Sequence, residues 1–143
     1  MKTPLRLRAL QRLGRKSRAA RSIRAICAAS IAAFASVHGA DFTSTWTGAN
    51  GLWSAFANWN TPGAAGVFPN NGVSTFDAIL SNGSTITLDL NITIEKFTLS
   101  SGTLAGGFNL ILNQDLNWTG GTMSGTGSTS VAGLGSTISG NGT

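Results

Sequence analysis

The chain has 143 residues and a formal net charge of +5, but nine of its ten basic residues lie within the first 24 positions. After Ala40 the single basic residue Lys96 stands against five acids, so the last 103 residues carry a net charge of −4. The basic pI therefore belongs to the leader and argues against a nucleic-acid-binding body. Because no cysteine or histidine follows position 40, a disulfide framework, a His- or Cys-ligated zinc and Ser-His-Asp catalysis are excluded there.

Residues 1–40 are predicted to be a secretory signal peptide. A basic n-region (1–24) precedes AICAASIAAFASV (25–37), in which 11 of 13 residues are apolar. This block matches an h-region and is shorter than the about 20 residues that span a bilayer. Small residues follow it, so we expect cleavage between Ala35 and Ala40 and a secreted or cell-surface chain without a membrane span.

Two other functions are consistent with a leader rich in basic residues. A mitochondrial transit peptide is also rich in arginine, and a basic arm could bind nucleic acid. Neither explains the alanine-rich apolar block that follows the arginines, so export is the favoured prediction.

Residues 41–75 are predicted to form a tryptophan-rich N-terminal cap and a loop rich in Pro and Gly. The stretch TWTGANGLWSAFANWN sets Trp46, Trp53 and Trp59 seven and six residues apart. On a regular strand this spacing points the rings to different sides, which does not suit a flat sugar-binding platform. We expect the rings to cover the open apolar end of a core, with their N–H groups on nearby carbonyls; contact with a sugar is the alternative.

Alternating strands follow from residue 76 onward. In ITLDLNITI (86–94) every second residue is Ile or Leu, which predicts one half-buried strand or two strands meeting at a corner near Asn91. KFTLSSG and FNLILNQDLNW continue the β pattern. No window after Ala40 has the period of an amphipathic helix.

A short repeat then recurs as GTLAG (102–106), GTMSG (121–125) and STISG (136–140), at offsets of 19 and 15 residues. Each copy is Thr, a large apolar residue, a small residue and Gly, typical of a short strand that ends in a turn. A chance match is the alternative in so biased a composition. Short strands recurring at about 20 residues favour a solenoid, here a parallel β-helix formed by residues 76–143, with a β-sandwich as the alternative.

The order of these motifs resembles a known family. TWTGANGLWSAFANWN, a Pro/Gly loop and TITLDLNITIEKFTLSSGTLAG are similar to the start of the passenger regions of large secreted bacterial proteins with autotransporter-associated β-strand repeats, which open on W-x-G, G-x-W and A-x-N-W. LNWTGGTMSGTGSTSV is similar to their later coils. The resemblance covers the chain from about Thr45 to its end, and it implies a right-handed β-helix on or outside the cell, associated with adhesion or surface display.

The sequence departs from that family at its end. Family members run for many coils and finish in an outer-membrane barrel or a sorting anchor, whereas this sequence stops at SGNGT in mid-pattern. We therefore expect an incomplete solenoid, which is a fragment, a truncated gene product or a short secreted relative, and further coils of a longer chain would cover its unpaired edge.

The acids offer little chemistry. Asp89 and Glu95 would lie about 20 Å apart on an extended chain, beyond the about 5 to 9.5 Å that a glycosidase pair needs. Adjacent coils could bring Asp89 near Asp115, but solvated surface charges are the favoured interpretation. We predict no catalytic residue, no cofactor and no metal site.

The predicted function is an exported, non-enzymatic surface scaffold or adhesin with a polysaccharide or a host or cell surface as partner. The alternative is a carbohydrate-binding or carbohydrate-processing module in which the tryptophans stack on sugar rings. A disordered fragment is the third hypothesis, which the β-branched residues and aromatics of the body disfavour.

Overall fold

The computed structural model describes residues 38–139, so the predicted n-region and h-region lie outside the described residues. The described part is all-β, with 13 strands and one short 3-10 helix. In chain order the elements are β1 (Phe42–Trp46), β2 (Gly51–Leu52), η1 (Phe56–Asn58), β3 (Trp59–Asn60), β4 (Phe76–Leu80), β5 (Thr85–Leu88), β6 (Ile92–Ile94), β7 (Lys96–Leu99), β8 (Thr103–Gly106), β9 (Leu110–Leu112), β10 (Leu116–Trp118), β11 (Thr122–Met123), β12 (Thr129–Val131) and β13 (Thr137–Ile138).

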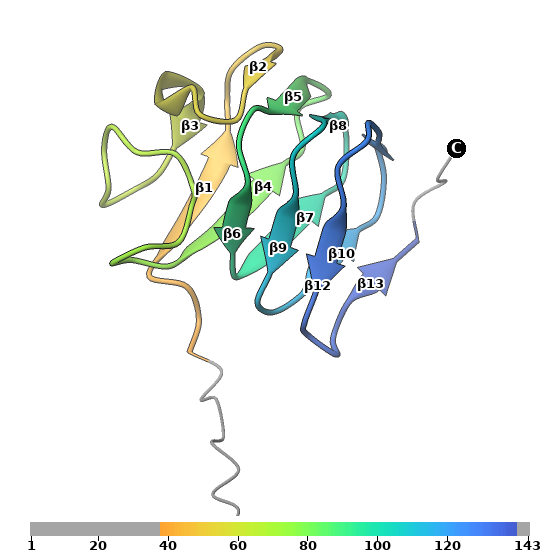
Figure 1. The fold of residues 1–143 in the computed structure, drawn as a ribbon. Coiled ribbons are helices and arrows are strands. Elements are labelled where there is room, and N and C mark those ends of the chain that lie inside the picture. The colour runs from red at the N-terminus through yellow and green to blue at the C-terminus, as the bar shows by residue number, and fades with distance from the viewer. Residues whose placement is uncertain (1–37, 140–143) are drawn as a thin grey trace, which may run out of the picture. The chain divides into compact units, whose positions relative to one another are not determined.

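The strands form three sheets whose neighbours come from successive coils. Sheet A has the order β13-β10-β7-β4-β1-β3, sheet B has β11-β8-β5-β2, and sheet C has β12-β9-β6. The chain visits the sheets in turn, and every pairing in the described part is parallel except β1 with β3. This is a β-solenoid of about three turns (Figure 1). The β-sandwich alternative is wrong, because a sandwich requires antiparallel sheets.

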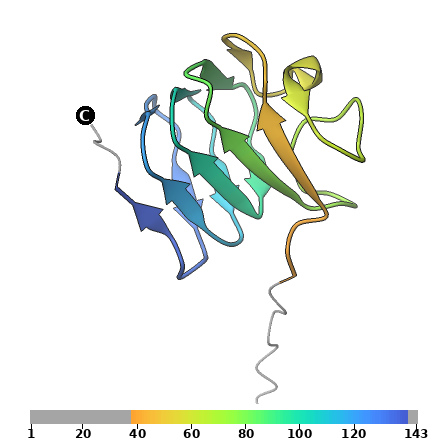
Figure 2. The ribbon, with the colours of Figure 1, turned by 180° about the vertical axis from the view of Figure 1, so that it is seen from behind.

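The figures also show the hand of the coil. In Figure 1 the strands of sheet C lie in front and run downward while the coils advance from left to right. In Figure 2, seen from behind, the strands of sheet A lie in front and run upward. A coil with this sense is right-handed, as parallel β crossovers almost always are.

The coil length is close to nineteen residues. Leu116 pairs with Phe97, nineteen positions earlier, and Thr122 pairs with Thr103 at the same interval. The first coil is longer, since Phe76 pairs with Phe42 thirty-four positions before it. The extra residues hold η1, β3 and the predicted loop. The sequence predicted that the solenoid begins at residue 76. In the structure it begins earlier, at Phe42.

The predicted repeat is correct for two copies and wrong for the third. Leu104 and Met123, the apolar residues of GTLAG and GTMSG, are register partners in sheet B. Ile138 of STISG pairs instead with Trp118 in sheet A. An offset of 15 residues is shorter than one coil, so it moves the motif to a different sheet.

The alternating stretch 86–94 is two strands that meet at a corner, the second of the two alternatives. Ile86 and Leu88 belong to β5, and Ile92 and Ile94 belong to β6. All four side chains are buried, because the three corner residues return the chain to the same inward phase. Together with the other inward residues they form one continuous core: Trp46, Trp53, Trp59, Phe76, Ala78, Leu80, Ile86, Leu88, Ile92, Ile94, Phe97, Leu99, Leu104, Leu110, Leu112 and Leu116.

Glycine is required where sheet A turns into sheet B. Gly83, Gly102 and Gly121 occupy this corner in successive coils with φ of 80°, 96° and 76°. A Cβ on Gly121 would also meet the carbonyl oxygen of Gly102 below it. Left-handed backbone and close coil stacking together exclude other residues here.

Candidate functional sites

The three tryptophans of the first coil form one buried aromatic cluster. The rings of Trp46 and Trp59 lie 5.0 Å apart in an edge-to-face arrangement, and those of Trp53 and Trp59 lie 4.8 Å apart. Trp53 also contacts Phe97, 5.9 Å away. The exposed fractions of the three indoles are 1%, 0% and 7%. Such rings have no free face on which a sugar could stack.

Each indole N–H in this cluster has a backbone acceptor. Trp46 donates to Ala49 O at 3.0 Å, Trp53 to Pro69 O at 2.8 Å, and Trp59 to Trp53 O at 2.8 Å. Buried indoles need such partners, because an unpaired buried donor is costly. The cluster lies at the end of the solenoid where β3 and β2 are the edge strands. The contacts are those of a packed terminal coil and leave no donor free for a ligand.

The loop 61–75 takes part in closing the same end. Asn71 N–H donates to Thr93 O at 2.6 Å, and Asn70 Oδ1 accepts from Thr93 N–H at 2.9 Å. These bonds occupy the free edge of β6. The Asp41 carboxylate accepts from Thr75 N–H at 2.8 Å and so holds the far end of the loop. The sequence predicted a loop here but gave no sign that it would cover a sheet edge.

The candidate acids hold coils together and do not converge. Asp89 accepts from the backbone N–H of Ser54 at 3.2 Å and from its hydroxyl, which joins the first coil to the second. Asp115 accepts from Gly135 N–H at 3.0 Å, in the following coil. Asp89 follows β5 and Asp115 precedes β10, so the two carboxylates sit at different corners. Both carboxylates are partly exposed, in keeping with the expectation of surface charges, and each in addition bonds a neighbouring coil.

Glu95 is the centre of an amide cluster at the corner between sheets C and A. Its carboxylate accepts from Asn71 Nδ2 at 2.8 Å, Asn113 Nδ2 at 3.0 Å and Gln114 Nε2 at 2.8 Å. The donors come from the coils on both sides of it. These three bonds use most of the acceptor capacity of the Glu95 carboxylate, and all of them join it to neighbouring coils.

Nothing in the sequence distinguishes Asp77 from the other acids. It faces outward on β4 beside its register partner Lys96. Burial raises the pKa of the Asp77 carboxyl, and the charge of Lys96 only partly offsets this. Its Oδ1 atom is buried without a hydrogen-bond partner. Within residues 38–139 no group of three or more His, Cys, Asp or Glu side chains is placed to hold a metal ion.

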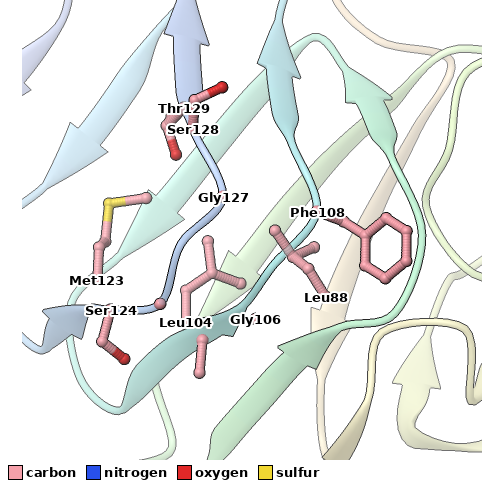
Figure 3. A pocket seen from close by; sticks show the side chains of 11 residues that line it. Leu88, Leu104, Gly106, Phe108, Met123, Ser124, Gly127, Ser128 and Thr129 are labelled. Carbon is pink, nitrogen blue, oxygen red and sulfur yellow. The ribbon is translucent and has the colours of Figure 1, made fainter.

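Two of the hollows on the surface of residues 38–139 are candidate ligand sites. The smaller, about 120 Å³, is at the corner between sheets B and C, where Leu88, Leu104, Phe108 and Met123 line it (Figure 3). Ligand pockets usually measure about 300 to 1,000 Å³, so this hollow is too small to hold a substrate.

The larger hollow, the loop groove, measures about 460 Å³ and lies between η1 and the loop 61–75. Its lining residues are Phe56, Gly66, Val67, Phe68, Asn70, Gly72, Val73, Ser74 and Phe76. Phe56 is 54% exposed, so about half of this residue is open to solvent at the groove. An apolar floor with a few amide and hydroxyl groups at its edge is the usual make-up of a small-ligand site.

No family model, curated protein or solved structure matches the chain. In the part that the structure describes, no helix is long and apolar enough to cross a membrane.

Proposed function

We propose that this chain is an exported, non-enzymatic β-solenoid that works as a scaffold or adhesive module on the surface of a bacterial cell or outside it. The observation that carries the proposal is the use of its polar side chains. Asp89, Glu95 and Asp115 bond neighbouring coils, and the buried tryptophans close the first coil. A chain whose carboxylates and indoles bond its own coils is suited to present a surface and not to carry out a reaction.

The leader supports the export part of the proposal. The solenoid begins at Phe42, directly after the predicted cleavage region, and residues 38 and 39 are exposed. A protease therefore has access to this junction without breaking a strand. The resemblance to passengers with autotransporter-associated repeats points to the same location.

Export is tested by fusing residues 1–40 to alkaline phosphatase, which is active only outside the bacterial cytoplasm. We expect an active reporter whose N-terminus begins between residues 36 and 41. Ile31→Lys puts a charge into the apolar block and should abolish activity, whereas Lys16→Arg conserves the charge and should not. An inactive wild-type fusion would show that the leader is not a signal peptide.

A carbohydrate-binding module is the second candidate, and the loop groove favours it. Phe56 offers a half-exposed aromatic side chain, while Asn70 and Ser74 supply polar groups in the lining of the groove. The sugar contact would then involve this phenylalanine and not the tryptophans.

Calorimetric titration of residues 36–143 with a panel of polysaccharides separates the two candidates. Saturable binding that Phe56→Ala weakens at least tenfold would support the carbohydrate module. Phe108→Ala is the matched control, because Phe108 is 45% exposed but lies outside the groove. Failure of every polysaccharide to bind would leave the scaffold as the proposal that stands.

A further inference from the structure

The residues directly before β1 bond to the folded body, and we call residues 38–41 the N-terminal arm. The Asp41 N–H donates to Thr75 Oγ1 at 3.0 Å. The Asp41 carboxylate accepts from Thr75 N–H at 2.8 Å and from the Thr75 hydroxyl at 3.2 Å. Thr75 lies 34 residues later, immediately before β4. These bonds fix the end of the arm that adjoins β1 to the end of the first coil.

The other end of the arm reaches two coils further along the solenoid. Gln114 Nε2 donates to His38 O at 2.9 Å, a contact between residues 76 positions apart. The same amide nitrogen donates to Glu95 Oε2 at 2.8 Å. The His38 carbonyl is therefore a member of the amide cluster around Glu95, at the corner between sheets C and A. The arm links the first and third coils without belonging to a sheet.

These contacts would be damaged by a cut at the later of the two candidate cleavage positions. Cleavage after Ala40 would remove the His38 carbonyl from Gln114. It would also turn the Asp41 N–H, which donates to Thr75, into an α-amino group that is mostly charged at neutral pH. A segment that is discarded with a signal peptide has no need of partners in distant coils, so the arm belongs to the body and not to the leader.

The sequence around the earlier position fits a signal peptidase better. Such enzymes favour small side chains at the first and third residues before the cut. The triplet AFA places Ala33 and Ala35 at these positions, whereas HGA places the larger His38 at the third residue before a cut after Ala40. Residues 25–32 remain as the apolar block, which is within the usual h-region length of about 7 to 15 residues.

From these features we propose that a signal peptidase cuts between Ala35 and Ser36 and that the N-terminal arm stays on the exported chain as a tie between coils. The reaction is hydrolysis of the Ala35–Ser36 peptide bond. Water supplies the hydroxyl that bonds to the Ala35 carbonyl carbon, and the Ser36 nitrogen keeps the electron pair of the broken bond and takes the proton. The inference rests on the proposed export of the chain.

The position of the cut is tested by expressing the full chain in a bacterial host and measuring the intact mass of the exported product. We expect Ser36 as its first residue. Ala35→Leu places a large side chain next to the cut and should leave most of the chain unprocessed. Ala40→Leu is the matched control, because it makes the same change at the other candidate position, and processing should continue at Ser36.

The role of the arm is tested with a precursor in which residues 1–35 are joined directly to Asp41. Its exported product lacks the His38 carbonyl, so it should melt about 4 °C or more below the product that begins at Ser36. Gln114→Leu should lower the melting temperature of the longer product by more than that of the shorter one. The reason is that the shorter product has already lost one of the two Gln114 bonds.

The outcomes separate this inference from the proposed function. An exported product that begins at Asp41, or at any residue other than Ser36, would overturn the inference while export stands. Equal melting temperatures for the longer and shorter products would also overturn it, because the arm would then contribute nothing to the fold. A chain that remains uncut inside the cell would refute the proposed export and the inference together.

Discussion

Replacing Trp53 by alanine should destabilise the solenoid more than any change on its surface. The Trp53 indole is completely buried, packs against Trp59 and Phe97, and donates to Pro69 O. Truncating a buried tryptophan costs about 3 to 5 kcal/mol of unfolding free energy. The carbonyl of Pro69 also loses its donor, which adds about 1 kcal/mol.

These magnitudes are large against the total. A domain of this size is stabilised by about 5 to 15 kcal/mol. One kcal/mol corresponds to about 4 °C or more in the melting temperature of a domain near 100 residues. We therefore expect Trp53→Ala to lower the melting temperature of residues 36–143 by at least about 15 °C.

Urea and thermal unfolding followed by far-UV circular dichroism measure this loss. Trp53→Phe keeps most of the ring volume but lacks the N–H donor, so it should cost about 1 to 2 kcal/mol. Phe56→Ala, at a half-exposed ring, should change the stability by less than about 1 kcal/mol. If Trp53→Ala behaves like Phe56→Ala, the indole is not part of the core and the packing described for the first coil is refuted.

Three further predictions concern the coils themselves. Gly121→Ala forces a side chain into a left-handed position against Gly102 O and should cost at least about 1 to 3 kcal/mol in urea unfolding. Asp89→Ala removes the acceptor of both Ser54 bonds and should cost about 1.5 to 3 kcal/mol by the same assay. Burial raises the pKa of Asp77 above its ordinary value of 3.8, so the folded state binds its proton more tightly and stability falls as the pH rises through that range. Asp77→Asn should therefore unfold at higher urea than the wild type at neutral pH, and the difference should disappear below pH 3.8.

Each of these has its own control. Gly72→Ala lies in open space and should be tolerated. Ser54→Ala keeps the backbone bond to Asp89 and should cost less than Asp89→Ala. A pH-independent difference between Asp77→Asn and the wild type would show that the carboxyl is not destabilised by burial.

The sequence predicted the solenoid from two local signals. Strict alternation in 86–94 indicated which side chains face inward, and the nineteen-residue interval between Leu104 and Met123 is the true coil length. The first signal arises within a single coil. The second arises between adjacent coils of similar length, so the number of residues that separates register partners is nearly constant.

The first coil and the corner contacts were harder to predict. Phe42 and Phe76 are register partners at thirty-four residues, and nothing in the sequence indicates how much of that interval is looped out. The partners of Glu95 likewise depend on register, since Asn71 and Gln114 reach it only after the coils have stacked. The spacing of the three tryptophans argued only against a flat platform on one strand face. That the rings contact one another depends on how the first coil folds back through β3, which the spacing does not indicate.

The glycine corner between sheets A and B has a consequence for how such a protein can change its length. Gly83, Gly102 and Gly121 repeat the same turn at nineteen-residue steps, and each corner contacts only the coils directly above and below it. A duplicated block of nineteen residues would therefore supply its own corner, its own inward side chains and an edge equivalent to the one it displaces. Lengthening by whole coils of about this length preserves the fold, since register partners in adjacent coils lie 18 residues apart at Thr85 and Thr103 and 20 apart at Asn117 and Thr137. A much longer insertion requires a loop, as the first coil has.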